Sequence, residues 1–206
     1  MSVKSFLIAI ASLLIAHTAY ASSVLGTVYL KNGTVAECSD ADRIKLPKDW
    51  SRLKILRNAY GKNKKTESYK FAEIDLIVCY HPQQPERKHK FVPVNSVGWC
   101  RVYFETPYIC VYIFSQRGYA IHANGGIADI QVQRSLSQSE VACYLMKRDA
   151  EEPYYTGGVY RSPKDSFRER ICRYIADDPE TAEKIRQSSS IRSKTLLMLQ
   201  NYKPQK

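Results

Sequence analysis

Residues 98–114 read GWCRVYFETPYICVYIF, and this stretch decides the fold. The turn-forming residues Glu105-Thr106-Pro107 divide it into two arms that are rich in aromatic and β-branched residues, which favour strands. Side chains alternate between two faces along a strand, and the second arm, residues 109–114, is apolar on both of them. Such a strand is typical of the middle of a sheet. The stretch therefore predicts a β-hairpin whose second strand lies in the core.

The sequence on either side of this hairpin predicts further antiparallel strands. Residues 27–38, TVYLKNGTVAEC, have two β-rich arms around Asn32-Gly33, a pair typical of a two-residue type I′ turn. We expect short strands at 53–56, 68–71 and 74–80, and a polar connection at 39–50. About five strands of this length suit a small roll or barrel-like module. Residues 118–123 and 127–133 are expected to extend the central hairpin into a four-stranded meander.

Residues 141–147 and 153–160 predict one more hairpin, because Tyr, Val and Cys dominate them. The alternative is a helix in this region, since Ser137 and Glu140 have the spacing of a capping box.

The period of the apolar residues changes to that of a helix in the C-terminal part. Phe167, Ile171 and Tyr174 lie on one face of a helix that opens near Ser162-Pro163. A second helix is expected from Asp178-Pro179, because aspartate and proline are typical of a helix start, and a third from about Ser193.

Strands followed by helices predict an α+β fold, here an antiparallel β-rich body with a C-terminal helical segment. We expect four parts: a signal peptide at 1–21, a basic β module at 22–92, a meander at 93–160, and helices at 161–206 that pack on the sheet.

The first 21 residues have the pattern of a secretory signal peptide. Lys4 supplies a positive start, residues 6–16 are apolar, and Ala19-Tyr20-Ala21 places alanine at positions −3 and −1 of a cleavage site. We therefore expect cleavage after Ala21 and a periplasmic or secreted product. The alternative, a retained membrane anchor, needs a longer apolar stretch.

The chain is strongly basic, with 31 Lys and Arg against 20 Asp and Glu and a net charge of +11. A surface of this charge attracts anionic partners. We expect the binding residues to be Arg52, Lys54, Arg57, Lys62, Lys64, Lys65 and Lys70. The expected partner is an anionic envelope component or an acidic protein. Nucleic acid is less favoured, because no ribonucleoprotein motif, KH loop or zinc-finger spacing is present. The alternative is a solvated basic loop without a ligand.

Six cysteines follow the leader, at positions 38, 79, 100, 110, 143 and 172. Cys100 and Cys110 are the candidate disulfide, because a turn centred near Glu105 would place them opposite each other on neighbouring strands. Burial as small apolar residues is the alternative. No CxxC, HExxH or similar spacing appears, so no metal or cofactor is expected.

Residues 96–101, SVGWCR, resemble the nucleophile segment of the L,D-transpeptidases, exported cysteine enzymes that act on cell-wall peptides. The resemblance makes Cys100 the candidate catalytic residue. The sequence departs from that pattern in two ways: Trp99 separates Gly98 from Cys100, and no histidine-glycine pair lies upstream to supply a base. A cell-wall enzyme is therefore the alternative to our main expectation, a non-enzymatic binding or scaffold protein.

A second resemblance joins the two ends of the chain. VYLKNGTVAEC (28–38), YKFAEIDLIVCYHP (69–82) and FRERICRYIADDPETAEKI (167–185) resemble segments of a loose group of exported, uncharacterised Bacteroidota proteins. The matching positions include Tyr174, Asp177 and Pro179. The resemblance implies an envelope protein of a Gram-negative bacterium, and it carries no catalytic or binding residue.

Overall fold

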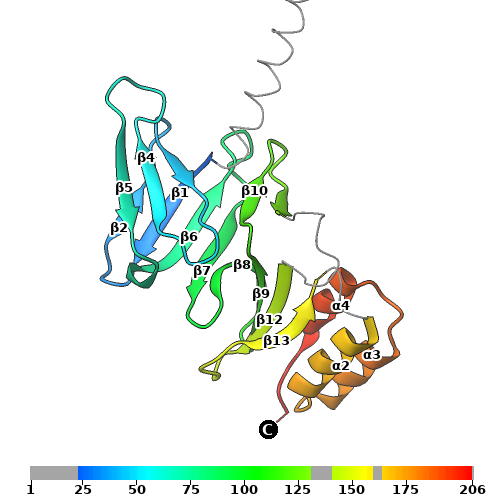
Figure 1. Cartoon of the computed structure of the whole chain (residues 1–206). Coiled ribbons are helices and arrows are strands. Elements are labelled where there is room, and N and C mark those ends of the chain that lie inside the picture. Colours follow the sequence, from blue (N-terminus) through cyan, green and yellow to red (C-terminus); the bar gives the residue numbers. More distant parts are fainter. Residues whose placement is uncertain (1–22, 131–140, 160–163, 206) are drawn as a thin grey trace, which may run out of the picture. The chain divides into compact units, whose positions relative to one another are not determined.

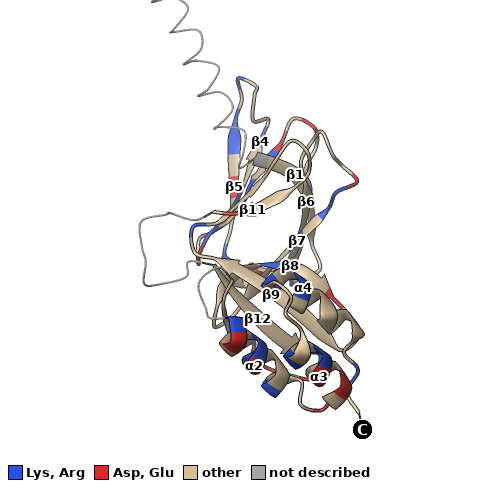
Figure 2. Cartoon of the chain, turned by 90° about the vertical axis from the view of Figure 1, so that its right-hand side faces the viewer, with Lys and Arg blue, Asp and Glu red and all other residues tan. Residues whose placement is uncertain are grey.

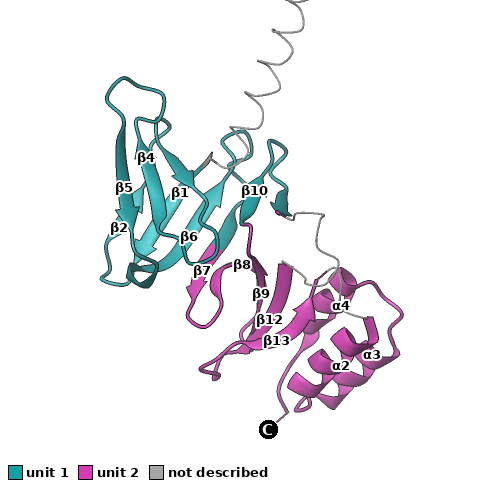
Figure 3. Ribbon diagram, in the orientation of Figure 1, with its two compact units in different colours: residues 1–90, 118–129 teal, residues 91–117, 130–206 magenta. Residues whose placement is uncertain are grey.

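The computed structural model describes residues 23–130, 141–159 and 164–205. Antiparallel strands are followed by three short C-terminal helices (Figure 1), so the predicted α+β class is confirmed. The chain divides into two compact units (Figure 3): unit 1 contains residues 1–90 and 118–129, and unit 2 contains residues 91–117 and 130–206. Within the described ranges, no helix is long and apolar enough to cross a membrane.

Unit 1 is built on a curved antiparallel sheet. Its strands are β1 (Ser23–Leu30), β2 (Val35–Glu37), β3 (Arg43–Lys45), β4 (Leu53–Arg57), β5 (Lys65–Tyr69) and β6 (Ile74–Tyr80). β1 pairs with β6 along one side, and with β3 and then β2 along the other. β4 continues the sheet from β3 to β5, and the short helix η1 (Phe71–Glu73) leads into β6. The side chains of Val28 on β1, Ile44 on β3 and Ile55 on β4 are fully buried.

The β1–β2 hairpin forms where the sequence predicts it, but its turn is not the predicted two-residue type I′ turn. The amide of Leu30 donates to the carbonyl of Thr34, and the amide of Gly33 donates to the carbonyl of Leu30. Gly33 has a positive φ of 84°, while Asn32 does not. The longer loop needs only one residue in the left-handed region, and glycine adopts it without steric cost. Asn32 instead accepts a hydrogen bond from the amide of Thr34 at 3.0 Å.

Unit 2 contains antiparallel strands that pair with one another. Its strands are β7 (His89–Val94, which begins at the end of unit 1), β8 (Gly98–Glu105), β9 (Ile109–Ser115), β12 (Val141–Lys147) and β13 (Tyr154–Gly158), in the spatial order β7-β8-β9-β12-β13. The β8–β9 hairpin and the central position of β9 confirm the predictions from residues 98–114. Ile109 and Val111 are fully buried. The β12–β13 hairpin is also confirmed, while Ser137 and Glu140 lie outside the described residues.

The predicted four-stranded meander is wrong in its second half. β10 (Tyr119–Ile121) and β11 (Ile127–Asp129) pair only with each other, as a two-stranded sheet that belongs to unit 1. β12 occupies the position beside β9 instead, and pairs with it over the whole length of both strands. Residues 131–133, the end of the predicted last strand, lie outside the described residues.

The helices of unit 2 are α2 (Lys164–Tyr174), α3 (Pro179–Gln187) and α4 (Arg192–Met198), followed by the short helix η2 (Leu199–Asn201). Asp178 caps α3 by accepting a hydrogen bond from the amide of Thr181, as predicted. Phe167, Ile171 and Ile185 share one core with Val111 and Leu145 of the sheet. The helices therefore pack on the sheet, which the apolar periodicity predicts. Ser162 and Pro163 lie outside the described residues.

The predicted Cys100–Cys110 disulfide is not formed. The register pairs Cys100 with Phe114 and Cys110 with Glu105, because the chain turns at residues 106–108 and a bulge interrupts β8 after Val102. The two cysteines therefore do not lie opposite each other. No disulfide links the six cysteines, each of which lies within the described ranges.

Candidate functional site

The predicted binding residues lie on and around the β4–β5 hairpin, but they do not share one face. Lys54 pairs across the strands with Ser68, and Arg57 with Lys65. Lys54 and Arg57 are three residues apart, so they point to opposite faces of the sheet. Lys62 and Lys64 lie in the exposed loop between the strands, and Lys70 precedes η1. Figure 2 shows the basic end of this hairpin in blue.

The guanidinium of Arg57 is bound by neighbouring groups of the protein, so it is not available to a ligand. Its guanidinium lies 2.9 Å from the carboxylate of Asp42 and 3.0 Å from that of Glu67, and it donates to the carbonyl of Glu37 at 2.6 Å. Hydrogen bonds from the guanidinium lower the pKa of Glu67. Because two carboxylates surround one cation, this group adds no positive charge to the surface. Arg57 therefore holds β4 to its neighbours.

Asp42 is the centre of this group. Its side chain accepts hydrogen bonds from the amides of Ser39 and Asn58 and from the hydroxyl of Ser39, in addition to the ion pair with Arg57. Burial raises the pKa of this carboxyl, but the hydrogen bonds from Asn58, Ser39 and Arg57 outweigh burial and lower the pKa well below its usual range. The ionised form of Asp42 therefore stabilises the folded state.

Asp42→Asn is expected to lower the free energy of unfolding at neutral pH by about 1–3 kcal/mol, because it weakens hydrogen bonds to a buried charged group. The pKa is lower in the folded state than in the unfolded chain, so the contribution is complete above the unfolded pKa of about 4 and disappears as pH falls through the folded value. Urea unfolding at neutral and acidic pH measures it. The stability difference between the two proteins should shrink on acidification; a constant difference would contradict an ionic role for Asp42.

The outer face of the sheet, defined here by the exposed sides of β3, β4 and β5, carries cations that were not among the predicted site residues. Lys45 lies directly opposite Lys54, and Arg43 lies on the same face of β3. Residues 39–50 were expected to be a polar connection, and the short strand β3 corrects this. The alternation of charged and apolar residues in Arg43-Ile44-Lys45 is the sequence pattern that could have identified β3. Ile44 is fully buried in the structure.

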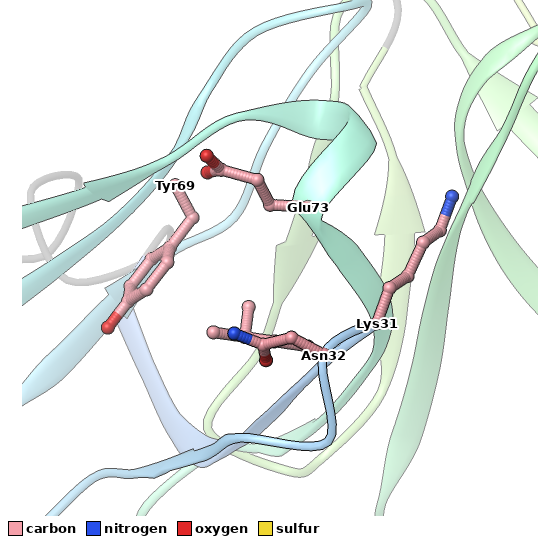
Figure 4. A pocket seen from close by; sticks show the side chains of 5 residues that line it. Lys31, Asn32, Tyr69 and Glu73 are labelled. Carbon is pink, nitrogen blue, oxygen red and sulfur yellow. The ribbon is translucent and has the colours of Figure 1, made fainter.

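A pocket of about 380 Å³ lies beside the hairpin and is lined by Leu30, Lys31, Asn32, Tyr69 and Glu73. In Figure 4 the ring of Tyr69 and the side chain of Asn32 border the space, while the ammonium of Lys31 points away from it. The hydroxyl of Tyr69 donates to Glu67 at 3.1 Å, and Glu73 accepts from the amide of Lys70 at 2.6 Å. Burial raises the pKa of Tyr69, so its phenol stays neutral. The pocket therefore offers an aromatic ring and hydrogen-bonding groups, but no activated nucleophile.

Cys100 lies in unit 2, fully buried in a cluster with Val94 and Val97. Burial raises the pKa of its thiol well above the usual range. A nucleophilic cysteine needs the thiolate, so this environment disfavours the role suggested by the resemblance to L,D-transpeptidases. Two of the histidines have hydrogen-bond partners among main-chain groups. The ring of His81 accepts a hydrogen bond from the amide of Gln83, and Nε2 of His89 lies 2.8 Å from the carbonyl oxygen of Gly125.

Across the described ranges, no group of His, Cys, Asp and Glu side chains is arranged to hold a metal ion. Comparisons of the chain with protein-family models, with curated proteins and with solved structures found no match. The functional argument therefore depends on the geometry of the basic surface of unit 1.

Proposed function

We propose that this chain is an exported, non-enzymatic binding or scaffold protein of a Gram-negative cell envelope, and that it holds an anionic partner on the basic surface of unit 1. The observation that carries the proposal is a group of exposed lysines on the β4–β5 hairpin. No ion pair among the described residues involves Lys54, Lys62, Lys64 or Lys65. Unpaired exposed lysines add little to stability, but they attract anions from a distance.

Two features of the sequence support the cellular location in this proposal. The leader-like residues 1–21 favour export, and the resemblance of three segments to exported Bacteroidota proteins favours the envelope. The envelope contains acidic glycans and phosphorylated lipids, which are natural partners for a chain with a net charge of +11.

Reversal of Lys62, Lys64 and Lys65 to glutamate is expected to weaken binding to lipopolysaccharide or an acidic glycan by about tenfold or more, because each lysine interacts with the polyanion in a screened, exposed setting. Binding of the unaltered protein should also fall steeply with added salt. Isothermal titration calorimetry over a range of salt concentrations measures both effects. Circular dichroism should show an unchanged fold, since surface substitutions cost little stability.

A matched control variant distinguishes the effect of charge on this surface from the effect of the net charge of the protein. Arg173, Lys194 and Lys203 are exposed residues of unit 2, and their reversal to glutamate changes the net charge by the same amount. The control variant should keep most of the affinity. If the two triple variants bind equally, or if salt has no effect, these lysines serve only solubility and the proposal fails.

A further inference from the structure

The outer face of β3, β4 and β5 holds two lysines in an unfavourable arrangement. Lys45 and Lys54 are direct cross-strand partners, so their Cβ atoms are about 5 Å apart and their charges repel. Both side chains are exposed. Their neighbours on the paired strands of this face are Ser23, Arg43, Leu56, Thr66 and Ser68, none of which is acidic. Repulsion of this kind is relieved when an anion lies between the two ammonium groups.

Arg52 adds a third cation to this face at a fixed position. Its Nε donates to the hydroxyl of Ser68 at 2.9 Å, and its Nη2 donates to the carbonyl of Ser68 at 3.1 Å. Ser68 is the cross-strand partner of Lys54, so the guanidinium lies beside the lysine pair. Both acceptors are uncharged. The arginine is therefore held in place while its positive charge remains uncompensated by the acceptors it binds.

An exposed tryptophan lies at the end of the hairpin where β4 begins and β5 ends. Trp50 is 50% exposed, and its ring packs against Phe71 with the ring centroids 5.0 Å apart. It precedes Arg52 by two residues, and Phe71 directly follows Lys70. A partly exposed indole among cations is typical of protein surfaces that meet a bilayer, where the ring lies at the level of the headgroups.

We propose that the outer face of β3–β4–β5, with Trp50 at its end, docks on a membrane surface that carries anionic phospholipid headgroups. The inference rests on the proposed function and names its partner. A phosphate bound between Lys45 and Lys54 relieves their repulsion, and the lipid interface offers the indole of Trp50 an apolar environment. A soluble anion accounts for the lysine pair but provides no place for the exposed ring. Charge complementarity and the tryptophan together favour lipid.

Vesicle binding with tryptophan fluorescence tests this directly, using phosphatidylcholine vesicles with and without phosphatidylglycerol. The other tryptophan, Trp99, is fully buried, so a shift of the emission on vesicle addition reports on Trp50. The expected result is binding to the anionic vesicles alone, with a blue shift. The double variant Lys45→Gln/Lys54→Gln should bind about tenfold or more weakly, because each basic residue near an anionic surface contributes to affinity. Trp50→Ser should also weaken binding and abolish the shift.

Arg173→Gln/Lys194→Gln removes the same charge from exposed positions of unit 2 and serves as the control, which should lose less affinity than the Lys45/Lys54 variant. Equal losses, or vesicle binding without a change in Trp50 emission, overturn the inference. Binding to an acidic glycan that survives without any binding to anionic vesicles overturns the lipid partner and leaves the proposed function standing. Absence of salt-dependent binding to every one of these anions overturns both.

Discussion

Phe167→Ala is expected to lower the free energy of unfolding by about 3–5 kcal/mol, because it removes a buried aromatic ring and leaves a cavity. Phe167 is 1% exposed and lies in the core that joins α2 to β9 and β12 of unit 2. The guanidinium of Arg192 also lies over its ring, 5.8 Å from the centroid, so the substitution removes a contact between α2 and α4 as well. Urea unfolding followed by circular dichroism measures the change.

Glu169 is exposed on the same helix and provides the matched control. Glu169→Ala should change stability by less than about 0.5 kcal/mol, since it removes no buried contact. If Phe167→Ala were as stable as this control, the C-terminal helices would not contribute to the core, and the helical segment would be a separable tail.

The parts of unit 2 that the sequence predicts well are those whose periodicity reflects burial directly. Phe167, Ile171 and Ile175 are repeated at helical spacing because they share one buried face. Residues 109–114 are apolar throughout because both faces of β9 are packed, one in the core with the helices and the other against the cluster around Cys100. Asp178-Pro179 identifies the start of α3 because aspartate caps and proline fits the first turn. In these cases local chemistry and tertiary packing favour the same structure.

The incorrect predictions concern features that depend on strand register or on pairing between strands distant in sequence. A bulge in β8 and the position of the turn separate Cys100 from Cys110, and no local pattern reports a shift of one or two residues. β12 pairs with β9 although a two-stranded sheet and residues 131–140 intervene in the sequence. The residue pattern that identifies each strand does not specify which other strand pairs with it.

The candidate site also depends on strand register, which the sequence does not reveal. A high density of Lys and Arg between residues 43 and 70 is visible in the sequence, but the division of these residues between two faces depends on the register of β3, β4 and β5. Arg57 faces Asp42 and Glu67, two carboxylates that are distant in sequence. Lys45 faces Lys54, which is nine residues further along the chain. Composition therefore predicts the sign of the surface charge, while the pairing of strands decides which cations remain available.

Gly26→Ala is expected to destabilise unit 1 by about 3 kcal/mol or more, because the added methyl group overpacks a site with no room for it. A Cβ at Gly26 would lie 2.2 Å from the carbonyl oxygen of Val78 and 2.7 Å from the Cα of Cys79. Both are main-chain atoms of β6, so no side-chain rotation relieves the clash. On the other side of β1, the carbonyl of Gly26 accepts a hydrogen bond from the amide of Cys38 at 3.0 Å, which opposes a shift of the strand away from β6.

Gly33→Ala separates the clash at Gly26 from the general cost of replacing a glycine. Gly33 has a φ of 84° but open space around its Cα, so alanine there meets backbone strain alone, which costs about 1–2 kcal/mol. Chemical denaturation of both variants should therefore rank Gly26→Ala as the more damaging, with a large loss of folded protein at moderate urea. Equal stability of the two variants would show that β1 can move away from β6, and that the close approach at Gly26 is not required to hold the sheet of unit 1 together.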